Sequence, residues 1–180
     1  MNRAVFLDRD GTINAEKRYV HRIEDFEFLP GAVEAIRLLN RKGYKVIVVT
    51  NQAGVARGYY AEEDVEKLHE WLIEELRRHD ASVDGIYYCP HHEQHGLGEY
   101  KTECSCRKPK PGMIQAGIRD FTVDPALSFT IGDKESDLAA GKRAGTRTIL
   151  VRTGYGGQMK TKLADYTAVD LLEAVQSIIP

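Results

Sequence analysis

Two carboxylates near the N-terminus are close enough to bind one divalent cation. Asp8 and Asp10 flank Arg9 directly after an apolar stretch. Two carboxylates this close repel each other unless a cation or a shared proton lies between them. Mg2+ takes oxygen ligands, commonly one or two carboxylates together with a substrate phosphate. We expect Asp133 and Asp137, which follow another apolar stretch, to complete the site. A turn at Asp10 and a helix cap at Asp133 also explain these residue types, and capping is compatible with metal ligation.

A second cluster carries soft and borderline metal ligands. Within 18 residues the chain has a C-x-H pair and, after twelve intervening residues, a C-x-C pair, formed by Cys89, His91, Cys104 and Cys106. Four such ligands fill a tetrahedral Zn2+ site and leave no open position, so we expect a structural site that orders the zinc loop, about residues 89–107. Generic zinc motifs favour C-x-x-C spacing, and free thiols in a histidine-rich loop are the alternative. His92 or His95 could take the place of His91.

The elements that must position these residues follow from an alternation of short apolar runs with longer amphipathic segments. The runs predict buried strands at Val5–Leu7, Lys45–Thr50, Gly85–Tyr88, Leu127–Ile131 and Thr148–Val151. The helical patterns cover Ala32–Asn40, Glu62–His79, Gly112–Phe121, Ser136–Ala144 and Leu171–Ile179. This alternation predicts an α/β fold: a Rossmann-like three-layer sandwich whose mostly parallel sheet has helices on both faces.

The residues that follow each predicted strand are the place to look for chemistry, because a parallel sheet binds its ligand beyond the carboxyl ends of its strands. In chain order they read DRDGT, TNQAG, CPHH, GDKESD and RTG. Exposure alone explains why strand ends are polar. It does not explain why four of these five segments carry acid, amide, hydroxyl or metal-ligand groups.

Composition indicates one globular domain spanning residues 1–180. Hydrophobic residues make up 42% and charged residues 29%, and the net charge of −2 gives no overall field that would attract nucleic acid or an anionic membrane. The apolar stretch at the N-terminus is too short for a signal peptide. Three cysteines, an odd number, favour reduced thiols or a metal site over disulfides. We therefore expect a cytoplasmic protein.

Four ordered segments resemble the motifs of the haloacid dehalogenase superfamily. They are DRDGT at Asp8–Thr12, Thr50 with Asn51, Lys108 within RKPKPG, and GDKESD at Gly132–Asp137. Each stands at its expected strand or helix end, and the resemblance covers the chain from about Val5 to about Gly156. It implies a Mg2+-dependent enzyme that forms a covalent intermediate on an aspartate.

The resemblance also implies the catalytic residues, which are Asp8, Asp10, Thr50 and Lys108. Asp8 would attack phosphorus, and Asp10 would protonate the leaving oxygen and then activate water. Mg2+ would be held by Asp8, the backbone carbonyl of Asp10, and Asp133. Thr50 and Lys108 would bind the oxygens of the transferring phosphoryl group. Asp137 would orient Asp133 or Lys134.

A second carboxylate at position 10 favours a phosphatase over a dehalogenase, because phosphoester hydrolysis needs an acid and a base. Phosphomutases of the superfamily also carry such a residue. They usually have a large cap domain after the first motif, whereas only 39 residues lie between Asp10 and Thr50 here. We therefore expect a minimal cap and an open site.

Within the superfamily the chain resembles the D-glycero-D-manno-heptose 1,7-bisphosphate 7-phosphatase family of lipopolysaccharide biosynthesis. The matching segments are FLDRDGTIN, YVH with FEFLPG, VVTNQAGVARG, YYCPHH, CSCRKPKPGM and VRTG. The family implies contacts to a phosphorylated sugar from Glu16, Lys17, Arg18, Tyr19, Thr50, Asn51, Gln52, Ala53, Arg107, Lys108 and Lys134. Arg107 would bind the distant phosphate, since a guanidinium can hold it bidentately. The family has serine where this chain has Ala53, which removes one possible hydrogen bond.

Three alternative functions fit less well. Histidinol-phosphate phosphatases are close relatives with a zinc loop, but their spacing between ligand pairs tends to be shorter. A polynucleotide 3′-phosphatase should carry a basic track for the strand, which a chain of net charge −2 does not offer. A zinc-stabilised binding module would be expected to have lost catalytic residues. In the absence of a coiled-coil pattern we expect a monomer. Preference for the α or β anomer depends on loop geometry that the sequence does not show.

Overall fold

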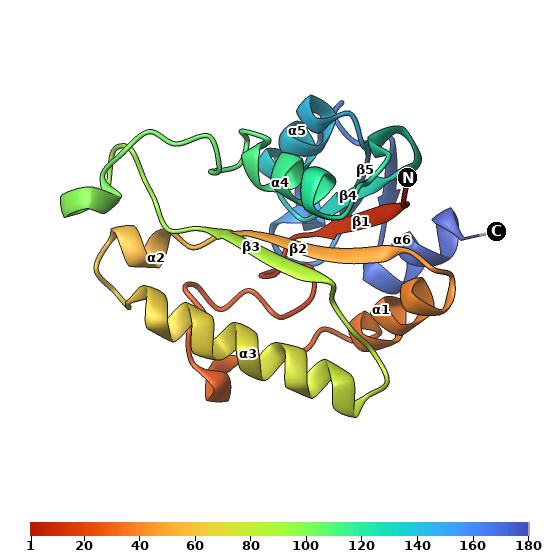
Figure 1. Ribbon diagram of the computed structural model, residues 1–180, viewed down its shortest axis with the longest axis horizontal. Coiled ribbons are helices and arrows are strands. Elements are labelled where there is room, and N and C mark those ends of the chain that lie inside the picture. Colours follow the sequence, from red (N-terminus) through yellow and green to blue (C-terminus); the bar gives the residue numbers. More distant parts are fainter. Residues whose placement is uncertain (180) are drawn as a thin grey trace.

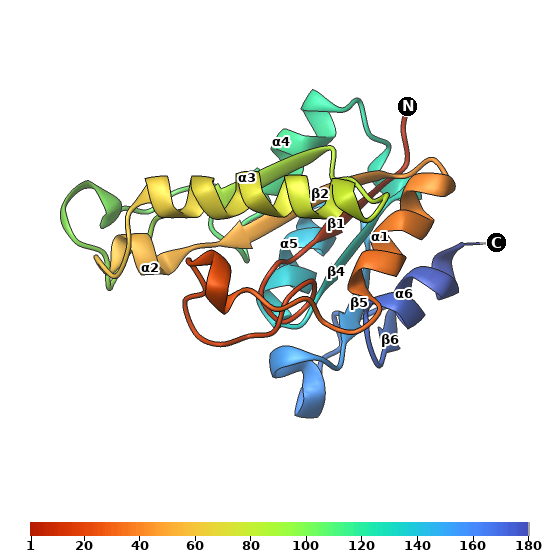
Figure 2. The same cartoon turned by 90° about the horizontal axis from the view of Figure 1, so that it is seen from below.

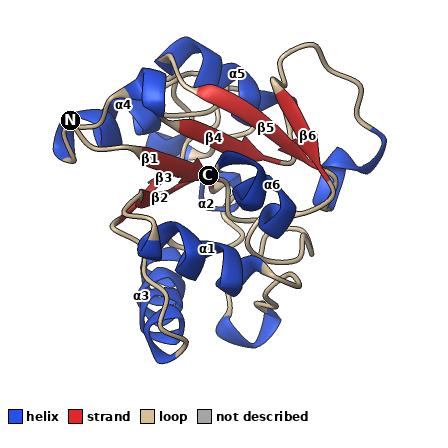
Figure 3. Cartoon of the chain, turned by 90° about the vertical axis from the view of Figure 1, so that its right-hand side faces the viewer, coloured by secondary structure: helices blue, strands red, loops and turns tan. Residues whose placement is uncertain are grey.

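A sheet of six strands forms the centre of the computed structural model, which describes residues 1–179. In chain order the strands are β1 Ala4–Leu7, β2 Lys45–Asn51, β3 Gly85–Cys89, β4 Phe129–Gly132, β5 Arg147–Val151 and β6 Tyr166–Ala168. Their order across the sheet is β3-β2-β1-β4-β5-β6, and each neighbouring pair is parallel. Figure 3 shows the strands together with the helices that cover them. The chain therefore runs outward from β1 to β3 and then returns to place β4 against the other side of β1.

Helices cover both faces of this sheet. They are α1 Ala32–Arg41, α2 Ala53–Ala56, α3 Glu62–Arg78, α4 Gly112–Asp120, α5 Glu135–Ala144 and α6 Leu171–Ile178. Helices α1, α3 and α6 lie on one face, and α4 and α5 lie on the other (Figures 1 and 2). Short 3-10 turns occur at Ile23–Asp25, Gly98–Tyr100, Pro125–Leu127 and Gly154–Gln158.

Alternate residues of the central strand pack into different halves of the core. Val5 and Leu7 of β1 contact the cluster beneath α1, α3 and α6, whereas Ala4 and Phe6 contact the cluster beneath α4. All four are fully buried. A strand covered on both faces has no polar face, which is why β1 reads as a continuous apolar run. The predicted three-layer α/β sandwich is confirmed.

The strand order reverses between β1 and β4, and this reversal decides where a ligand can bind. The loops that leave β1 and β4 run to opposite faces of the sheet, so a crevice opens at their carboxyl ends. Asp8 is the first residue after β1, and Asp133 is the first after β4. In Figure 1 the zinc loop also projects at this end of the sheet, while both termini lie at the other end.

The predicted element ends agree with the structure within one residue, except at the start of β4. The strand predicted from Leu127 begins at Phe129. Leu127 instead ends a 3-10 turn that Pro125 opens and the Asp124 side chain caps through the backbone N–H of Ala126, at 3.0 Å. The short helix α2 and the edge strand β6 were not predicted, because four and three residues are too few to show a periodic pattern. Within residues 1–179 no helix is both long and apolar enough to cross a membrane.

Candidate active site

Three carboxylates converge where β1 and β4 end. Asp8 follows β1, Asp133 follows β4, and Asp137 lies in the first turn of α5. The backbone N–H of Asp8 donates to the carbonyl of Ile131 at 3.0 Å, so the parallel pairing of the two strands continues into the site. One oxygen from each carboxylate lies within 4.8 Å of the others, and all three residues are buried. Such a group of oxygens fits a hard divalent cation.

Asp133 shows most directly that this group fits a metal ion. Its Oδ2 accepts a hydrogen bond from the backbone N–H of Tyr155 at 2.8 Å. Its Oδ1 is buried and has no hydrogen-bond partner in residues 1–179. Burial, and then the neighbouring charge of Asp8, raise the pKa of Asp133 to about 8. An unpaired carboxylate oxygen facing a second carboxylate would be stabilised by a cation between them.

Two glycines allow the backbone to approach Asp133 this closely. Gly11 has a φ of 86° and Gly154 a φ of 55°, which are left-handed conformations that favour glycine. A Cβ at either position would overlap the Asp133 carboxylate. The Thr153 hydroxyl donates to the carbonyl of Gly11 at 2.6 Å and ties the two loops together.

Lys108 reaches the carboxylates from the end of the zinc loop. Its side chain is 2% exposed, and its Nζ lies 2.8 Å from Asp8 Oδ1 and 2.6 Å from Asp137 Oδ1. Nζ also donates to the carbonyl of Val49 at 2.7 Å. Burial alone would lower the pKa of Lys108, but the charges of Asp137 and Asp8 outweigh it and raise this pKa. The ammonium is therefore held charged beside Asp8.

Asn51 holds the backbone of this lysine. Its Oδ1 accepts from the Lys108 N–H at 3.0 Å, and its Nδ2 donates to the Lys108 carbonyl at 3.1 Å. The family resemblance implied that Asn51 contacts substrate; Asn51 lines the cavity, and its side-chain amide also holds Lys108. Asp137 makes one contact of the kind expected and one that was not. Its Oδ2 does accept from the Lys134 N–H at 3.0 Å, but its other oxygen pairs with Lys108, a contact that the sequence did not indicate.

Hydrogen-bond donors from several side chains surround the carboxylate of Asp10. Asn14 Nδ2 donates to Asp10 Oδ1 at 3.0 Å, Gln52 Nε2 donates to Oδ2 at 3.2 Å, and Arg9 lies 3.0 Å from Oδ2. Burial acts to raise the pKa of Asp10, but the charge of Arg9 and these hydrogen bonds outweigh it and lower this pKa. Gln52 also donates to Thr50 Oγ1 at 2.8 Å and accepts from the Tyr60 hydroxyl at 2.8 Å. Thr50 and Asp10 are thereby held in one network.

A cavity of about 560 Å3 opens over these residues, which is within the usual size for a small-molecule site. Ten of the eleven residues predicted to contact substrate line it. Lys17 does not, and its Nζ instead lies 2.8 Å from Glu27 Oε2 on the surface. Tyr60, Ser136 and Tyr155 line the cavity without having been predicted.

The cations of the cavity are held by specific partners. Lys134 Nζ lies 3.2 Å from Glu16 Oε2 and 4.8 Å from the centre of the Tyr155 ring. Burial alone would lower the pKa of Lys134, but the charges of Asp8, Asp133 and Glu16 outweigh it and raise this pKa. Arg107 donates to the carbonyl of His91 at 3.2 Å, so its position depends on the zinc loop.

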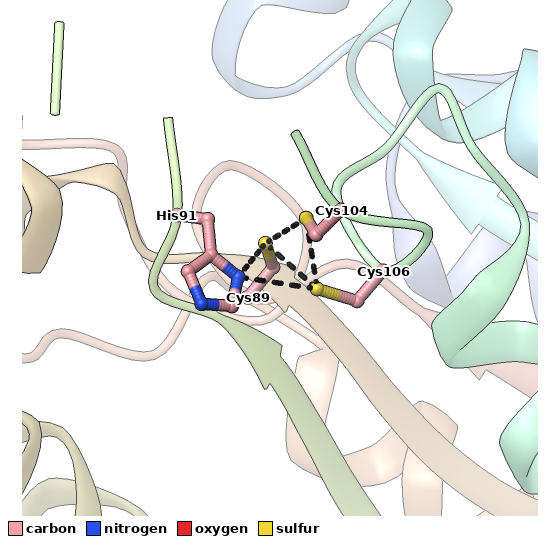
Figure 4. A group of neighbouring side chains, drawn as sticks. All are labelled: Cys89, His91, Cys104 and Cys106. Atoms are coloured by element: carbon pink, nitrogen blue, oxygen red, sulfur yellow. Dashed lines mark hydrogen bonds between the residues drawn. The ribbon is translucent and has the colours of Figure 1, made fainter. Parts of the chain in front are cut away.

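The cysteines and one histidine of the zinc loop form a compact cluster (Figure 4). Cys106 Sγ lies 3.1 Å from the Sγ atoms of Cys89 and Cys104, and those two are 3.5 Å apart. His91 Nδ1 lies 3.6 Å from Cys106 Sγ and 3.8 Å from Cys89 Sγ. A tetrahedron with Zn–S bonds of about 2.3 Å has edges of about 3.8 Å, so the sulfur atoms lie somewhat closer together than in a filled site. The four ligand atoms surround one position that a Zn2+ ion could occupy.

Of the candidate histidines, His91 is the one that the fold brings to the thiols. His92 is absent from the metal-ligand groups found in residues 1–179. Its Nδ1 instead accepts from the backbone N–H groups of Gln94 and His95, each at 3.2 Å. His95 lies beside His92, with 4.8 Å between the ring centres.

Comparisons with known proteins agree with this geometry. Residues 5–70 match the haloacid dehalogenase-like hydrolase family, and residues 105–176 match the HAD-hydrolase-like family. The D-glycero-beta-D-manno-heptose-1,7-bisphosphate 7-phosphatase of Haemophilus ducreyi is 48% identical over 179 residues, covering 96% of this chain and 98% of its own. The chain belongs to the heptose 1,7-bisphosphate 7-phosphatase family.

Two further members of this family are informative. The protein of Burkholderia mallei is 50% identical over 150 residues, covering 83% of this chain and 79% of its own, and is named for the alpha anomer. A crystal structure of the D,D-heptose 1,7-bisphosphate phosphatase of B. bronchiseptica, complexed with magnesium and phosphate, is 31% identical with a TM-score of 0.87. It covers 98% of this chain and 97% of that one. The prediction of a phosphatase of the haloacid dehalogenase type is confirmed.

Several residues of this heptose bisphosphatase site had no recognisable signal in the sequence. Tyr60 and Tyr155 line the cavity from turns, and His69 lies on the buried face of α3. A tyrosine in a turn and a histidine on an apolar helix face are ordinary residues in any globular protein. Only the spatial proximity of His69 to Arg9, 60 positions earlier, marks it as part of the site.

Proposed function

We propose that this chain hydrolyses the 7-phosphate of D-glycero-D-manno-heptose 1,7-bisphosphate through an aspartyl-phosphate on Asp8. The observation that carries the proposal is the contact of the buried Lys108 ammonium with Asp8, at 2.8 Å, in a cavity that also contains Arg107 and Lys134. A nucleophile with one cation beside it suits a transferring phosphoryl group. Two further cations suit a substrate with a second phosphate.

The first step transfers the phosphoryl group to Asp8. An oxygen of Asp8 forms a bond to phosphorus, and the bond from phosphorus to the sugar oxygen breaks. That oxygen takes a proton from Asp10, which must be protonated in this step although Arg9 favours its anion, and Lys108 and Thr50 bind the phosphoryl oxygens. In the second step a water molecule attacks the phosphorus of the intermediate, and Asp10 accepts its proton. Inorganic phosphate leaves, and Asp8 is restored.

Two metal sites belong to the proposal. Mg2+, when bound by Asp8, Asp133 and the backbone carbonyl of Asp10, supplies the charge that lets a carboxylate approach a phosphate. The unpaired, buried Oδ1 of Asp133 supports this assignment. The second ion is a structural Zn2+ in the cysteine cluster. Since Cys106 directly precedes Arg107, that ion would hold Arg107 at the cavity.

We also propose that residues 1–180 are one phosphatase domain, that it acts as a monomer, and that it works in the cytoplasm. Three free thiols support a reducing compartment. The open cavity supports a domain without a separate cap, because a sugar bisphosphate brings bulk of its own that can fill the site.

Steady-state kinetics test the substrate. The kcat/KM for the heptose bisphosphate should exceed that for histidinol phosphate by several orders of magnitude, and the product should retain its 1-phosphate. Relatives of similar identity are named for different anomers, so both anomers should be assayed. Comparable efficiency with histidinol phosphate, or loss of the 1-phosphate, would refute the substrate assignment.

The variant Asp8→Asn tests the nucleophile. Turnover should fall on the order of 10^4-fold or more, because the amide cannot form the covalent intermediate. The fold should persist, since Lys108 keeps its ion pair with Asp137. Substantial residual turnover in a folded Asp8→Asn protein would contradict the mechanism.

A further inference from the structure

Arg9 is a buried cation that has no role in the proposed mechanism. It stands between the two catalytic aspartates in sequence, yet its side chain is fully buried. Its guanidinium lies 3.0 Å from Asp10 Oδ2, and Asp10 is the only carboxylate within ion-pair distance of it in residues 1–179. A buried charge needs several hydrogen bonds as well as its counter-ion. The remaining partners of Arg9 therefore decide how it is held.

One of these partners is His69, on the face of α3 that packs toward the sheet. Arg9 Nη1 lies 3.1 Å from His69 Nε2. A guanidinium can only donate, so Nε2 accepts and the imidazole is neutral with its proton on Nδ1. Burial, and then the charge of Arg9, lower the pKa of His69 to about 3. The neutral ring is therefore stable throughout the physiological pH range.

The other nitrogen, Nη2, connects His69 to the site. It donates to Asp10 Oδ1 at 3.1 Å and to the backbone carbonyl of Val20. Val20 directly follows the loop that carries Glu16 and Tyr19 into the cavity. One guanidinium thus joins α3, the Asp10 carboxylate and the base of a cavity loop.

We infer that His69 is a positioning residue for Asp10, acting through the buried guanidinium of Arg9. The inference rests on the proposed function, in which Asp10 is the general acid and base. The His69 imidazole on α3 accepts a hydrogen bond from one edge of the Arg9 guanidinium. The other edge of the guanidinium then holds the Asp10 carboxylate at a fixed angle to the leaving group. Misplacement of a catalytic group by about 1 Å can cost on the order of 100-fold in rate.

The chemistry of the acceptor matters as much as its place. A carboxylate at position 69 would pair with the charge of Arg9 and weaken its attraction for Asp10. A lysine there would repel it. A neutral acceptor such as the His69 imidazole satisfies Nη1 and leaves the single positive charge to Asp10. The alternative role for His69 is simple packing beside the Tyr88 ring, whose centre is 5.8 Å away.

The experiment compares two esters with different leaving groups. A sugar alkoxide needs a proton from Asp10 in order to leave, whereas p-nitrophenolate leaves readily without one. The kcat/KM covers only the steps up to departure of the leaving group, so it isolates the acid role. The variants are His69→Leu, which removes the acceptor, and His69→Gln, whose Oε1 can replace Nε2.

We expect His69→Leu to lower kcat/KM for the heptose bisphosphate at least about tenfold more than for p-nitrophenyl phosphate. In His69→Gln the ratio of the two kcat/KM values should lie within about threefold of the wild-type ratio. Equal losses for both esters would indicate only a smaller folded fraction, and would overturn the inference. If His69→Leu does not fold, His69→Asn, which is too short to reach Arg9, takes its place in the same comparison.

Asp10→Asn separates this inference from the proposed function. If Asp10→Asn lowers kcat/KM more for the heptose bisphosphate than for p-nitrophenyl phosphate and His69→Leu does not, the inference fails while the mechanism stands. If Asp10→Asn lowers kcat/KM equally for both esters, Asp10 is not the general acid, and the proposed mechanism fails together with the inference.

Discussion

Lys108 and Asp8, 100 positions apart in the chain, form a buried contact of 2.8 Å between Nζ and Oδ1. Asn51 holds the lysine backbone through two hydrogen bonds, and Asp137 pairs with the same ammonium. The lysine is therefore placed before substrate arrives. Such preorganisation is what electrostatic stabilisation of a transferring phosphoryl group requires.

Replacing this lysine should affect stability as well as rate. Lys108→Met leaves Asp8 and Asp137 buried without their shared counter-ion, which should lower the free energy of unfolding by about 3–5 kcal/mol, measured by denaturant titration. Turnover should also be lost. Lys110→Met is the matched control, because Lys110 pairs with Glu103 on the surface, where water screens the pair, and its loss should leave the free energy of unfolding almost unchanged. Equal stability of the two variants would contradict the buried ion pair.

Gly11→Ala should disable the metal site. Its Cβ would overlap the Asp133 carboxylate, so Mg2+-dependent turnover and the rise of the melting temperature with Mg2+ should both be lost. Gly43→Ala is the control, because Gly43 has a similar φ of 73° but nothing within 4 Å of the added Cβ. It should cost about 1 kcal/mol of stability and leave turnover unchanged. Retained activity in Gly11→Ala would show that Asp133 can move without loss of function.

The pKa of His69 predicts a loss of stability in acid. The unfolded chain binds a proton at this residue below about pH 6.5, whereas the folded protein does not until about pH 3. The free energy of unfolding should therefore fall as the pH drops from 6.5 toward 3, by about 2 kcal/mol from this group between pH 7 and pH 5. The ionisable groups facing the ring are Arg9, Asp10 and Tyr88.

Denaturant titrations over this pH range check the assignment. In His69→Gln the free energy of unfolding should fall less steeply as the pH drops, because residue 69 no longer binds a proton in the unfolded chain. The exposed His79→Gln should keep the acid loss, because His69 is still present. A His69→Gln curve that runs parallel to the wild-type curve would assign the loss to another group.

Removal of the zinc should weaken substrate binding more than chemistry. Elemental analysis should find about one zinc per chain. After chelation, KM for the heptose bisphosphate should rise at least about tenfold, because Arg107 loses the support of its loop and a charge-assisted contact of about 1.5–3 kcal/mol. KM for p-nitrophenyl phosphate, which has no second phosphate, should change little. A zinc-free protein with unaltered kinetics on both substrates would show that the loop does not need the ion.

The sequence by itself was enough to predict the layers of the fold and the centre of the site. Alternating apolar runs and amphipathic segments reveal the strands and helices, and parallel strands end at one edge of the sheet. Asp8 and Asp133, each directly after a strand, must therefore meet. The clustering of Cys89, His91, Cys104 and Cys106 was also predictable, because these residues lie close together in the chain and fall in one loop.

Only the tertiary structure decided which distant side chains touch. The contact of His69 with Arg9 exists because α3 packs its apolar face into the same core cluster as β1, and no local pattern encodes that distance. The pairing of Asp137 with Lys108 depends in the same way on how α5 and the zinc loop meet. Periodicity is a property of neighbouring residues, so it predicts elements. Contacts between elements depend on how their side chains pack together, which periodicity does not contain.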